Sequence, residues 1–392
     1  MLNLPTLTVH RSKRAQQGYP WIYSNELSLT TLDKELPIGG LVRFATVDGV
    51  FLGIGTFNRH ALISGRVLSH HEYEYPNKEW FYKKFLKAKN ARERIYKDPF
   101  YRWVHAESDG LAGLIIDRYG VTAVIQVNTA GMELLQDVWI AALKESEPLI
   151  ESWVIRKDSN SRQLEHIDNK PVEIVGTLVE HQVIGQEGPV YFIADVLDGQ
   201  KTGWFYDQRE NRALIARWIN PGDTVLDLFT HTGSFALYAA HKGAVVDAVD
   251  RSALALELGS KAALLNQVSN RITWHQAQVF HYLEQESRFF DMVIVDPPAF
   301  VKSKATLNQG IQGYIKTLTL ALKVVKPGGL LCFTSCSHLI TPSDILDICI
   351  KAGLKTKRQL TVLAHLGAGF DHPVRAELQE LTYLKGVLVA VD

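Results

Sequence analysis

The sequence predicts an α/β protein whose C-terminal half holds a parallel sheet, preceded by a β-rich N-terminal region and a mixed α+β middle region. Short β-type runs separated by turn residues fill the first 72 residues. Helical and strand patterns share the next part of the chain, up to about residue 190. From about residue 191, strands alternate with helical segments, the signature of βαβ units. We therefore expect three domains, 1–72, 73–190 and 191–392.

The N-terminal region is predicted to be a set of short strands. Residues 41–44 and 51–57 carry β-type side chains, and Asp48-Gly49 supplies turn residues between them. Residues 61–67 continue the pattern, and no long segment of this region has helical periodicity. We expect a small β-rich domain here.

The middle region mixes helices and strands. The expected elements are helices over 79–96 and 134–143 and strands over 122–127 and 153–156. Phe81, Phe85 and Ala88 recur at spacings of four and three, which places them on one face of a helix. Tyr119-Gly120 stands just before the first strand and indicates a hairpin.

The segment 78–97 is rich in basic side chains. It holds eight Lys or Arg residues against two Glu, with five aromatic residues interleaved. A basic stretch with aromatics could follow a phosphate backbone. The alternative is a solvated helix surface whose Lys stems lie over apolar neighbours, and charge runs are more often of this kind.

The C-terminal region alternates strands with helices. The expected strands are 224–229, 244–249, 292–295, 329–334 and 384–391, and the expected helices are 234–241, 253–266 and 314–325. Such alternation builds a parallel sheet, and open sheets of this kind bind ligands at the carboxyl ends of their strands. Candidate site residues are therefore sought in the loops that follow the strands.

Composition excludes several protein classes. Lys plus Arg and Asp plus Glu number 42 each, so net charge says nothing about partners. Three cysteines are too few, and odd in number, for a disulfide framework, and no Cys/His cluster has zinc spacing. No apolar stretch approaches the roughly 20 residues that span a bilayer, and residues 1–20 lack a signal-peptide core. We expect a cytoplasmic protein with no bound metal and no membrane contact.

The segment 225–235 joins a strand, a loop and a helix. Gly233 turns the loop, and Asp250 ends the next strand, 17 residues later. An acidic side chain there can accept hydrogen bonds from ribose hydroxyls. Dinucleotide sites need two or three loop glycines, whereas S-adenosylmethionine carries no phosphate and one glycine can suffice. The loop therefore favours S-adenosylmethionine; a βα turn that binds no ligand is the alternative.

Two more strand ends fit the same site. Gln278 and Val279 follow a further strand, which is third in chain order and precedes the strand at 292–295. Side-chain and backbone groups at its end could meet adenine. Asp296-Pro297-Pro298 follows the fourth strand, and the two prolines give a rigid turn beside the cofactor. An acid before Pro-Pro after a buried strand is typical of enzymes that methylate bases.

Cys336 follows a later strand of the same sheet, in a Ser-Cys-Ser loop, and is a candidate nucleophile. Carbon 5 of cytosine is a poor nucleophile, but attack of a thiolate on carbon 6 makes carbon 5 enamine-like, so that it can accept a methyl group. Asp296 could hydrogen-bond to the exocyclic amine and to ring nitrogen 3. The alternative for Cys336 is a small buried thiol. We give this interpretation to Cys332 and Cys349, because they lie inside an apolar strand and an apolar helix, respectively.

These features resemble a known family, the bacterial 23S ribosomal RNA 5-methylcytosine methyltransferases that carry an N-terminal PUA-like domain. The motifs that carry the resemblance are the segments 18–24 (GYPWIYS), 107–111 (ESDGL), 116–120 (IDRYG), 198–209 (DGQKTGWFYDQR), 296–298 (DPP), 335–337 (SCS) and 371–373 (DHP). They span nearly the whole chain and are highly specific together. The resemblance implies a PUA-like domain, an α+β central domain and a Rossmann-like class I methyltransferase domain, in that order.

By resemblance, the chain would be an S-adenosylmethionine-dependent methyltransferase of ribosomal RNA or of a ribosomal subunit, and it could pair as a homodimer. Cys336 would be the nucleophile, with Asp296 as the second catalytic residue. The cofactor residues would be Asp207, Gln208, Asp227, Phe229, Gly233, Asp250, Gln278, Val279 and Asp296. Lys201 and Lys302 would contact RNA.

The sequence departs from the family at three positions. Gln278 stands where the family usually has Asp, so we expect an altered contact with the adenine amine rather than its loss, because an amide oxygen still accepts hydrogen bonds. Ser234 replaces a glycine and narrows the cofactor loop. Ala299 follows Pro298 where many other RNA cytosine methyltransferases have a second Cys, so release of the product needs another base.

Three other functions compete with this interpretation. A methyltransferase acting on ring nitrogen 7 of guanine could use the same scaffold but needs no thiol, so Cys336 discriminates against it. An inactive RNA-binding homologue is disfavoured by intact Gly233, Asp250, Asp296 and Cys336. A nicotinamide dehydrogenase is disfavoured by the single loop glycine.

Overall fold

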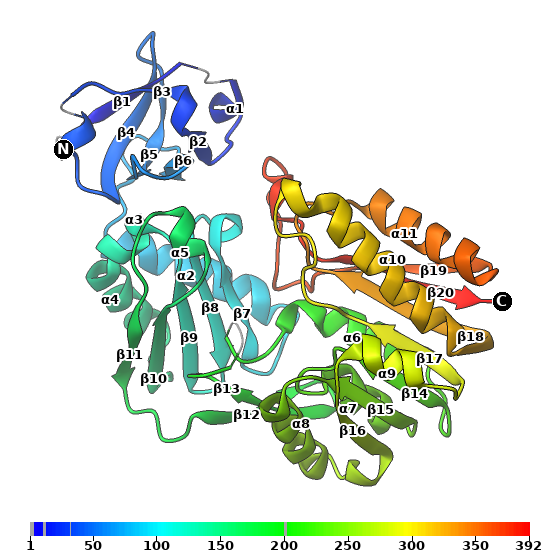
Figure 1. Cartoon of the computed structure of the whole chain (residues 1–392). Helices are drawn as coiled ribbons and strands as arrows, with labels where there is room; N and C mark the ends of the chain where they lie inside the picture. Colours follow the sequence, from blue (N-terminus) through cyan, green and yellow to red (C-terminus); the bar gives the residue numbers. More distant parts are fainter. Residues whose placement is uncertain (1–3, 11–12, 32, 200–201) are drawn as a thin grey trace. The chain divides into compact units, whose positions relative to one another are not determined.

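The computed structural model describes residues 4–10, 13–31, 33–199 and 202–392 (Figure 1). The chain divides into two compact units. Unit 1 comprises Met1–Val183, Asp195–Trp204 and Phe370–Gln379, and unit 2 comprises Ile184–Ala194, Phe205–Gly369 and Glu380–Asp392. The finer division at 72 and 190 remains a prediction. In the described part of the chain, no helix has both the length and the apolar character needed to cross a membrane.

Unit 1 begins with a six-stranded, largely antiparallel sheet. Its strands are β1 (Thr6–Val9), β2 (Trp21–Tyr23), β3 (Leu27–Ser28), β4 (Gly40–Thr46), β5 (Phe51–Phe57) and β6 (Ile63–Ser69), in the spatial order β2-β6-β5-β4-β1-β3, with the short helix α1 (Lys13–Gln16) between β1 and β2. The strand pair predicted around Asp48-Gly49 is confirmed as the antiparallel pair of β4 and β5. Gly49 adopts a φ of +81°, which glycine tolerates in such a turn. Phe44 and Phe57 are central to the core of this sheet.

The second sheet of unit 1 is mixed and has helices packed against it. Its strands are β7 (Phe100–His105), β8 (Leu114–Tyr119), β9 (Thr122–Val127), β10 (Ser152–Lys157) and β11 (Lys170–Gly176), in the order β11-β10-β9-β8-β7, and its helices are α2 (Lys78–Glu93), α3 (Ala130–Leu134), α4 (Gln136–Ser146) and α5 (Ser161–Leu164). The predicted hairpin is confirmed, with Tyr119 opposite Thr122. The side chain of Asn77 caps α2 by accepting the Trp80 N–H. Trp80, Phe81, Phe85 and Ala88 of α2 belong to the hydrophobic core of this sheet.

Acidic residues of the sequence motifs in unit 1 are held by hydrogen bonds from arginine residues. Asp109 accepts two hydrogen bonds from Arg92, at 2.7 and 2.8 Å. Asp117 accepts two from Arg102, both at 2.8 Å. Asp371 accepts the backbone N–H of Arg102 at 2.9 Å. The two bidentate pairs fix the geometry of Asp109 and Asp117 strongly, and a backbone group orients Asp371, so all three motif acids have partners within unit 1.

Arg66 joins the two sheets of unit 1. Its guanidinium group contacts Glu107 at 2.6 Å and Glu165 at 2.8 Å. Glu107 also accepts the indole N–H of Trp21 at 3.0 Å. Burial opposes the charge on Arg66, but the two carboxylates raise its pKa above the ordinary value for arginine. The cluster therefore couples β6 to the turn that follows β7.

Unit 2 is built on a seven-stranded sheet. Its strands are β14 (Thr224–Leu228), β15 (Val245–Asp250), β16 (Ile272–Gln276), β17 (Phe290–Val295), β18 (Val325–Ser335), β19 (Leu360–Gly367) and β20 (Lys385–Val391), in the order β16-β15-β14-β17-β18-β20-β19. The first five strands in this order are mutually parallel, and β20 runs antiparallel to both of its neighbours. This is the predicted Rossmann-like architecture.

Helices cover both faces of this sheet. The helices are α6 (Arg209–Ile215), α7 (Ser234–His241), α8 (Ala253–Leu265), α9 (Val279–Gln285), α10 (Leu307–Lys323) and α11 (Pro342–Thr356). Side chains of α6, α7 and α8 share one hydrophobic core with one face of the sheet, and those of α9, α10 and α11 share a second core with the other face. A separate two-stranded sheet of β12 (Gln182–Glu187) and β13 (Val190–Asp195) precedes them in the chain.

Unit 2 differs from the sequence prediction at some elements. Helix α10 begins at Leu307, well before the predicted start at 314. Gly310 interrupts the apolar periodicity of the first turns of this helix. The position nevertheless requires glycine, because a Cβ at 310 would lie 2.4 Å from the side chain of Val301. Helix α11, which Thr341 caps and Pro342 opens, contains Cys349 and is the apolar helix predicted around this residue, for which the sequence set no bounds. Strand β19 was missed because its side chains do not alternate regularly between buried and exposed.

Replacing Arg66 with Met is expected to lower the free energy of unfolding of unit 1 by about 3–5 kcal/mol, because two buried carboxylates lose their cation. Urea unfolding monitored by circular dichroism measures this change. Arg43→Met is the matched control, since the pair of Arg43 with Glu72 is 30% and 44% exposed and should contribute less than about 1 kcal/mol. Equal effects of the two substitutions would contradict the assigned importance of the Arg66 cluster.

Candidate active site

The parallel strands of unit 2 end together at one edge of the sheet. Leu228 pairs in register with Val249 on one side and with Val295 on the other. Asp250 ends β15, and Asp296 follows β17 directly. Strand β15, the next in the chain, lies on one side of β14, and β17 lies on the other side. The strand order thus reverses at β14, and open sheets bind ligands at such a switch point. The sheet therefore gathers these carboxylates at the edge where a ligand is expected.

The loop between β14 and α7 has an unusual backbone. The φ angle is +61° at Phe229, +52° at His231 and +76° at Gly233. Left-handed φ at two non-glycine residues costs free energy, and such strain clusters at ligand sites. A Cβ at position 233 would lie 2.4 Å from the ring of Trp274. Gly233 is therefore required by both its backbone conformation and its packing.

Asp227 supports this loop from within the sheet. Its Oδ2 accepts the backbone N–H of Ala236 at 3.0 Å and also the hydroxyl of Thr230. Its Oδ1 is buried and accepts no hydrogen bond from the described residues. Burial raises the pKa of Asp227 to about 7; its hydrogen bonds oppose this rise, and the charges of Asp296 and Asp250 add to it.

Asp250 is oriented by backbone groups. Its Oδ2 accepts the N–H of His231 at 3.0 Å, and its Oδ1 accepts the N–H of Ser252 at 2.9 Å. Each carboxylate oxygen has two lone pairs, and the side chain is only half-buried. Asp250 can therefore accept further hydrogen bonds from a ligand.

Asp296 is linked to the segment before α6 through Thr334. The hydroxyl of Thr334 donates to Asp296 at 2.5 Å, and the amide of Gln208 donates to the Thr334 hydroxyl at 3.4 Å. The neighbouring Asp207 accepts the hydroxyl of Tyr383 at 2.6 Å. These bonds bring Asp207 and Gln208, both predicted as site residues, to the same group of strand ends.

Cys336 lies in a loop that Tyr314 holds in place. The hydroxyl of Tyr314 accepts a hydrogen bond from Ser335 at 3.0 Å and is hydrogen-bonded to Ser337 at 2.8 Å. It also accepts the backbone N–H of Phe300 at 3.1 Å. Cys336 itself is half-buried. The clamp fixes the residues on both sides of the thiol and ties them to the loop that follows β17.

The other two cysteines are buried. Burial, with added repulsion from Asp296 and Asp227, raises the pKa of Cys332 well above its ordinary value. Burial raises the pKa of Cys349 to about 12. A thiol is a poor nucleophile in this state, so Cys336 is distinguished from both by its exposure.

Gln278 and Val279 mark the start of α9. Gln278 is exposed, and its side chain makes no capping hydrogen bond. Val279 is 4% exposed and packs in the core, so only its backbone groups can meet a ligand. The structure thus gives the two residues different possibilities: a side-chain contact for Gln278 and a main-chain contact for Val279.

Two family models match parts of this chain. A family model of PUA-like domains matches residues 6–70, and one of S-adenosylmethionine-dependent methyltransferases matches residues 143–357. This chain is an S-adenosylmethionine-dependent methyltransferase. The PUA-like domain coincides with the six-stranded sheet, and the predicted fold class and cofactor are confirmed.

Curated relatives align with this methyltransferase over nearly its whole length. Proteins named "Ribosomal RNA large subunit methyltransferase I" are 32% identical in Shewanella denitrificans and 34% identical in Shewanella amazonensis, each over 97% of both chains. The protein of the same name in Pseudoalteromonas atlantica is 33% identical over 98% of both chains. The methyltransferase belongs to the family of these proteins.

Solved structures share the fold. A SAM-dependent methyltransferase from Streptococcus mutans aligns with a TM-score of 0.83 and 22% identity, over 99% of this chain and 100% of its own. A methyltransferase complexed with SAH aligns with a TM-score of 0.85 and 21% identity over the same shares. At this identity the likeness concerns the fold alone.

The site of the methyltransferase suits its cofactor. The buried Oδ1 of Asp227 has no partner in the described part of the chain, and Asp250 and Asp296 lie close enough to raise the pKa of Asp227. Carboxylates gathered in this way favour a cationic ligand, and S-adenosylmethionine carries a sulfonium and an ammonium group. Asp250 has acceptor capacity left for ribose hydroxyls.

Ser234, one of the departures from the family pattern, is accommodated by Arg212. Ser234 begins α7, and its hydroxyl accepts a hydrogen bond from Arg212 at 3.4 Å. Arg212 is fully buried and donates two hydrogen bonds of 2.7 Å to Glu187. The hydroxyl of Ser234, on the strand-to-helix turn, thus bonds to the buried ion pair of Arg212 and Glu187.

The two lysines predicted to contact RNA differ in what the structure describes. Lys201 lies outside the described residues. Lys302 is exposed in the segment between β17 and α10, and its backbone N–H donates to Thr306 at 3.4 Å. An exposed side chain at this place is available to a large substrate.

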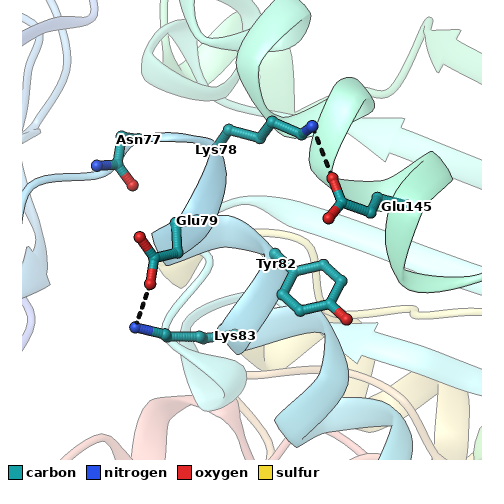
Figure 2. Close-up of a pocket in the computed structure, with 6 residues that line it drawn as sticks. All are labelled: Asn77, Lys78, Glu79, Tyr82, Lys83 and Glu145. Carbon is teal, nitrogen blue, oxygen red and sulfur yellow. Dashed lines mark ion pairs between the residues drawn. The ribbon is translucent and has the colours of Figure 1, made fainter.

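The basic stretch on α2 is largely neutralised within unit 1. A hollow of about 560 Å³ is lined by Asn77, Lys78, Glu79, Tyr82, Lys83 and Glu145, whose side chains are drawn in Figure 2. Lys78 pairs with Glu145 at 2.6 Å, and Lys83 pairs with Glu79 at 2.7 Å. Charges paired in this way favour the interpretation of α2 as a solvated helix surface.

Sequence reasoning missed the residues that bond to the candidates. Thr334 and Tyr314 are buried polar residues on apolar elements, and Tyr383 reaches Asp207 from far along the chain. Lys385 is a lysine at the start of an otherwise apolar strand. A charged or hydroxyl group in an apolar run was the available signal, because such groups are buried only with partners.

Asp227→Asn tests the raised pKa. The pKa of Asp227 is about 7 in the folded protein, above its ordinary value of 3.8, so the folded state keeps this proton to a higher pH than the unfolded state does. The wild-type free energy of unfolding should therefore fall relative to the Asn variant as pH rises from about 5 to about 7, by up to about 1.4 kcal/mol per unit. Above pH 7 the difference should level off. Urea unfolding across this range measures it, and a pH-independent difference would contradict the assignment.

Proposed function

We propose that this methyltransferase forms 5-methylcytosine in 23S ribosomal RNA, with Cys336 as the nucleophile. The observation that carries the proposal is the half-buried thiol of Cys336, in a loop whose flanking serines are hydrogen-bonded to Tyr314. This loop follows β18, and Asp296 follows the neighbouring strand β17. The name of the relatives supports an RNA of the large ribosomal subunit as the substrate.

The chain's own residues supply the covalent chemistry. The Cys336 thiolate attacks carbon 6 of the cytosine, a sulfur–carbon bond forms, and the electron pair of the ring double bond shifts toward carbon 5. Asp296, held by Thr334, accepts a hydrogen bond from the exocyclic amine and so orients the base. S-adenosylmethionine, when bound, supplies the methyl group.

Release reverses the addition. A base removes the proton from carbon 5, the double bond re-forms, and the sulfur–carbon bond breaks to return the thiolate. Ala299 stands after Pro298, so no second thiol lies at that position to assist. Release in this chain therefore depends on a base other than cysteine at position 299.

The cofactor residues are proposed from their acceptor capacity and position. Asp250 would accept the ribose hydroxyls, and Gln278 with the backbone of Val279 would meet the adenine. Asp227 and Asp207 would face the cationic part of the cofactor, and Phe229, Gly233, Gln208 and Asp296 would complete the site. The support is their common place at or near the carboxyl ends of neighbouring parallel strands.

RNA binding is proposed to use more than the methyltransferase fold. The PUA-like sheet of residues 6–70 would help hold the RNA, together with the α+β sheet of unit 1. Lys302, an exposed cation, would contact phosphates, and the same role is proposed for Lys201. Such contacts position RNA without reading its sequence.

Nucleoside analysis tests the proposed product. Purified wild-type protein is incubated with labelled S-adenosylmethionine and bacterial ribosomal RNA or large subunits. We expect labelled 5-methylcytidine, absent with Cys336→Ala. Cys349→Ala is the matched control, because Cys349 is buried on α11, and should keep methylating. Labelled 7-methylguanosine, or activity that survives Cys336→Ala, would overturn the mechanism but keep the fold and the cofactor.

Cofactor binding separates the proposed roles of Cys336 and Asp250. Asp250→Ala should weaken S-adenosylmethionine binding by about 1–3 kcal/mol, since an acceptor of hydrogen bonds is lost. Cys336→Ala should leave the affinity nearly unchanged, because the thiol acts on the base. Isothermal titration calorimetry without RNA measures both. An equal loss of affinity in the two variants would count against the assignment.

A further inference from the structure

The loop that carries Cys336 folds around the ammonium group of Lys385. Lys385 begins β20 and pairs with Ser335, the last residue of β18. Its Nζ donates hydrogen bonds to the carbonyl oxygens of Ser337 at 3.0 Å and Ile340 at 2.5 Å. The paired residue precedes Cys336 and the two acceptors follow it. Lys385 is therefore held on both sides of the residue that bears the thiol: its backbone pairs before Cys336, and its ammonium group is bound by carbonyl groups after it.

Lys385 is a lysine in a place where lysine is unfavourable by itself. It is 5% exposed, and burial of an ammonium group opposes its charge. Burial lowers the pKa of Lys385, whereas Cys336 and then Asp344 raise it. The effect of Cys336 is reciprocal, because a thiolate that favours an ammonium group is favoured by it to the same extent. The two carbonyl acceptors also favour the charged form.

The other charged or titratable groups near this loop give the thiolate no comparable support. Asp296, at the end of β17, bonds to Thr334 beside the loop, and a carboxylate there disfavours a second negative charge. Asp344, in the first turn of α11, is also acidic. His338 is exposed within the loop, with its ring 5.6 Å from that of Tyr383. A thiolate in this setting needs a fixed cation, and Lys385 is in place to supply it.

We propose that Lys385 maintains Cys336 as a thiolate by holding an ammonium charge beside it. The S–H bond of Cys336 ionises, its proton passes to solvent, and the electron pair stays on sulfur while Lys385 remains protonated. Lys385 is a positioning residue that acts through Cys336 and does not touch the base. The inference deepens the proposed function, since it rests on Cys336 as the nucleophile of that reaction.

Alkylation of the thiol tests the proposal without RNA or cofactor. The full-length protein reacts with iodoacetamide between pH 5.5 and 9.5, and modification of the Cys336 peptide is followed by mass spectrometry. Only the thiolate reacts, so the pH midpoint of the rate reports ionisation. In the wild type the midpoint should lie below the ordinary cysteine value of about 8.5. A midpoint at or above this value overturns the proposal.

Three variants sharpen the test. Lys385→Met should slow alkylation of Cys336 at pH 7 on the order of tenfold, because a charge interaction is lost. Lys385→Arg, which keeps the charge, should restore most of the rate. Lys316→Met removes a charge from α10 that is 61% exposed and should change nothing. A folded Lys385→Met protein with a wild-type profile overturns the proposal. If that variant does not fold, the wild-type midpoint and the Lys385→Arg rate decide.

The two proposals fail separately. If alkylation follows the expected profile but 5-methylcytidine does not form, the proposed function fails and the effect of Lys385 on Cys336 stands. If 5-methylcytidine forms and requires Cys336 but the wild-type midpoint is not lowered, the proposed function stands and the role of Lys385 fails.

Discussion

The parallel register of β15, β14, β17 and β18 is the constraint on which the rest of unit 2 depends. Leu228, Val249, Val295 and Phe333 occupy equivalent positions on these strands, so the residues that follow them emerge at one edge. A shift by one residue would turn each side chain to the opposite face of the sheet. The register is therefore what converts acids and a thiol scattered over more than a hundred residues of chain into one group.

The edge of this sheet combines opposite electrostatic demands. Asp227, Asp250 and Asp296 suit a cationic methyl donor; burial, to which the charges of Asp296 and Asp250 add, raises the pKa of Asp227. The same negative charge disfavours a thiolate in the next loop. Lys385 begins the antiparallel strand β20, and its ammonium group bonds to that loop. It supplies the cation that the carboxylates do not. The antiparallel strand thus adds a charge that the parallel part of the sheet does not provide.

Hydroxyl groups hold the candidate site residues in position. Tyr314 ties the Cys336 loop to the loop after β17, and Thr334 ties Asp296 to Gln208. Buried hydroxyl groups with several partners hold their surroundings rigidly. In unit 1 the motif acids Glu107, Asp109 and Asp117 instead form ion pairs with arginines. Those ion pairs give these acids a role in stabilising the fold.

The sequence by itself determined the fold class, the cofactor class and the candidates at the strand ends, because these follow from periodicity, from a single loop glycine at 233 and from acids placed directly after apolar runs. It placed Cys349 in an apolar helix but could not set the bounds of α11 or the early start of α10, where glycines and a short apolar stripe weaken the pattern. Only the tertiary structure brought Thr334 to Asp296, Tyr314 to the Cys336 loop and Lys385 to Ser337. The physical reason is that these contacts join residues distant in the chain, and a pattern read along one segment carries no record of which strand will lie beside it.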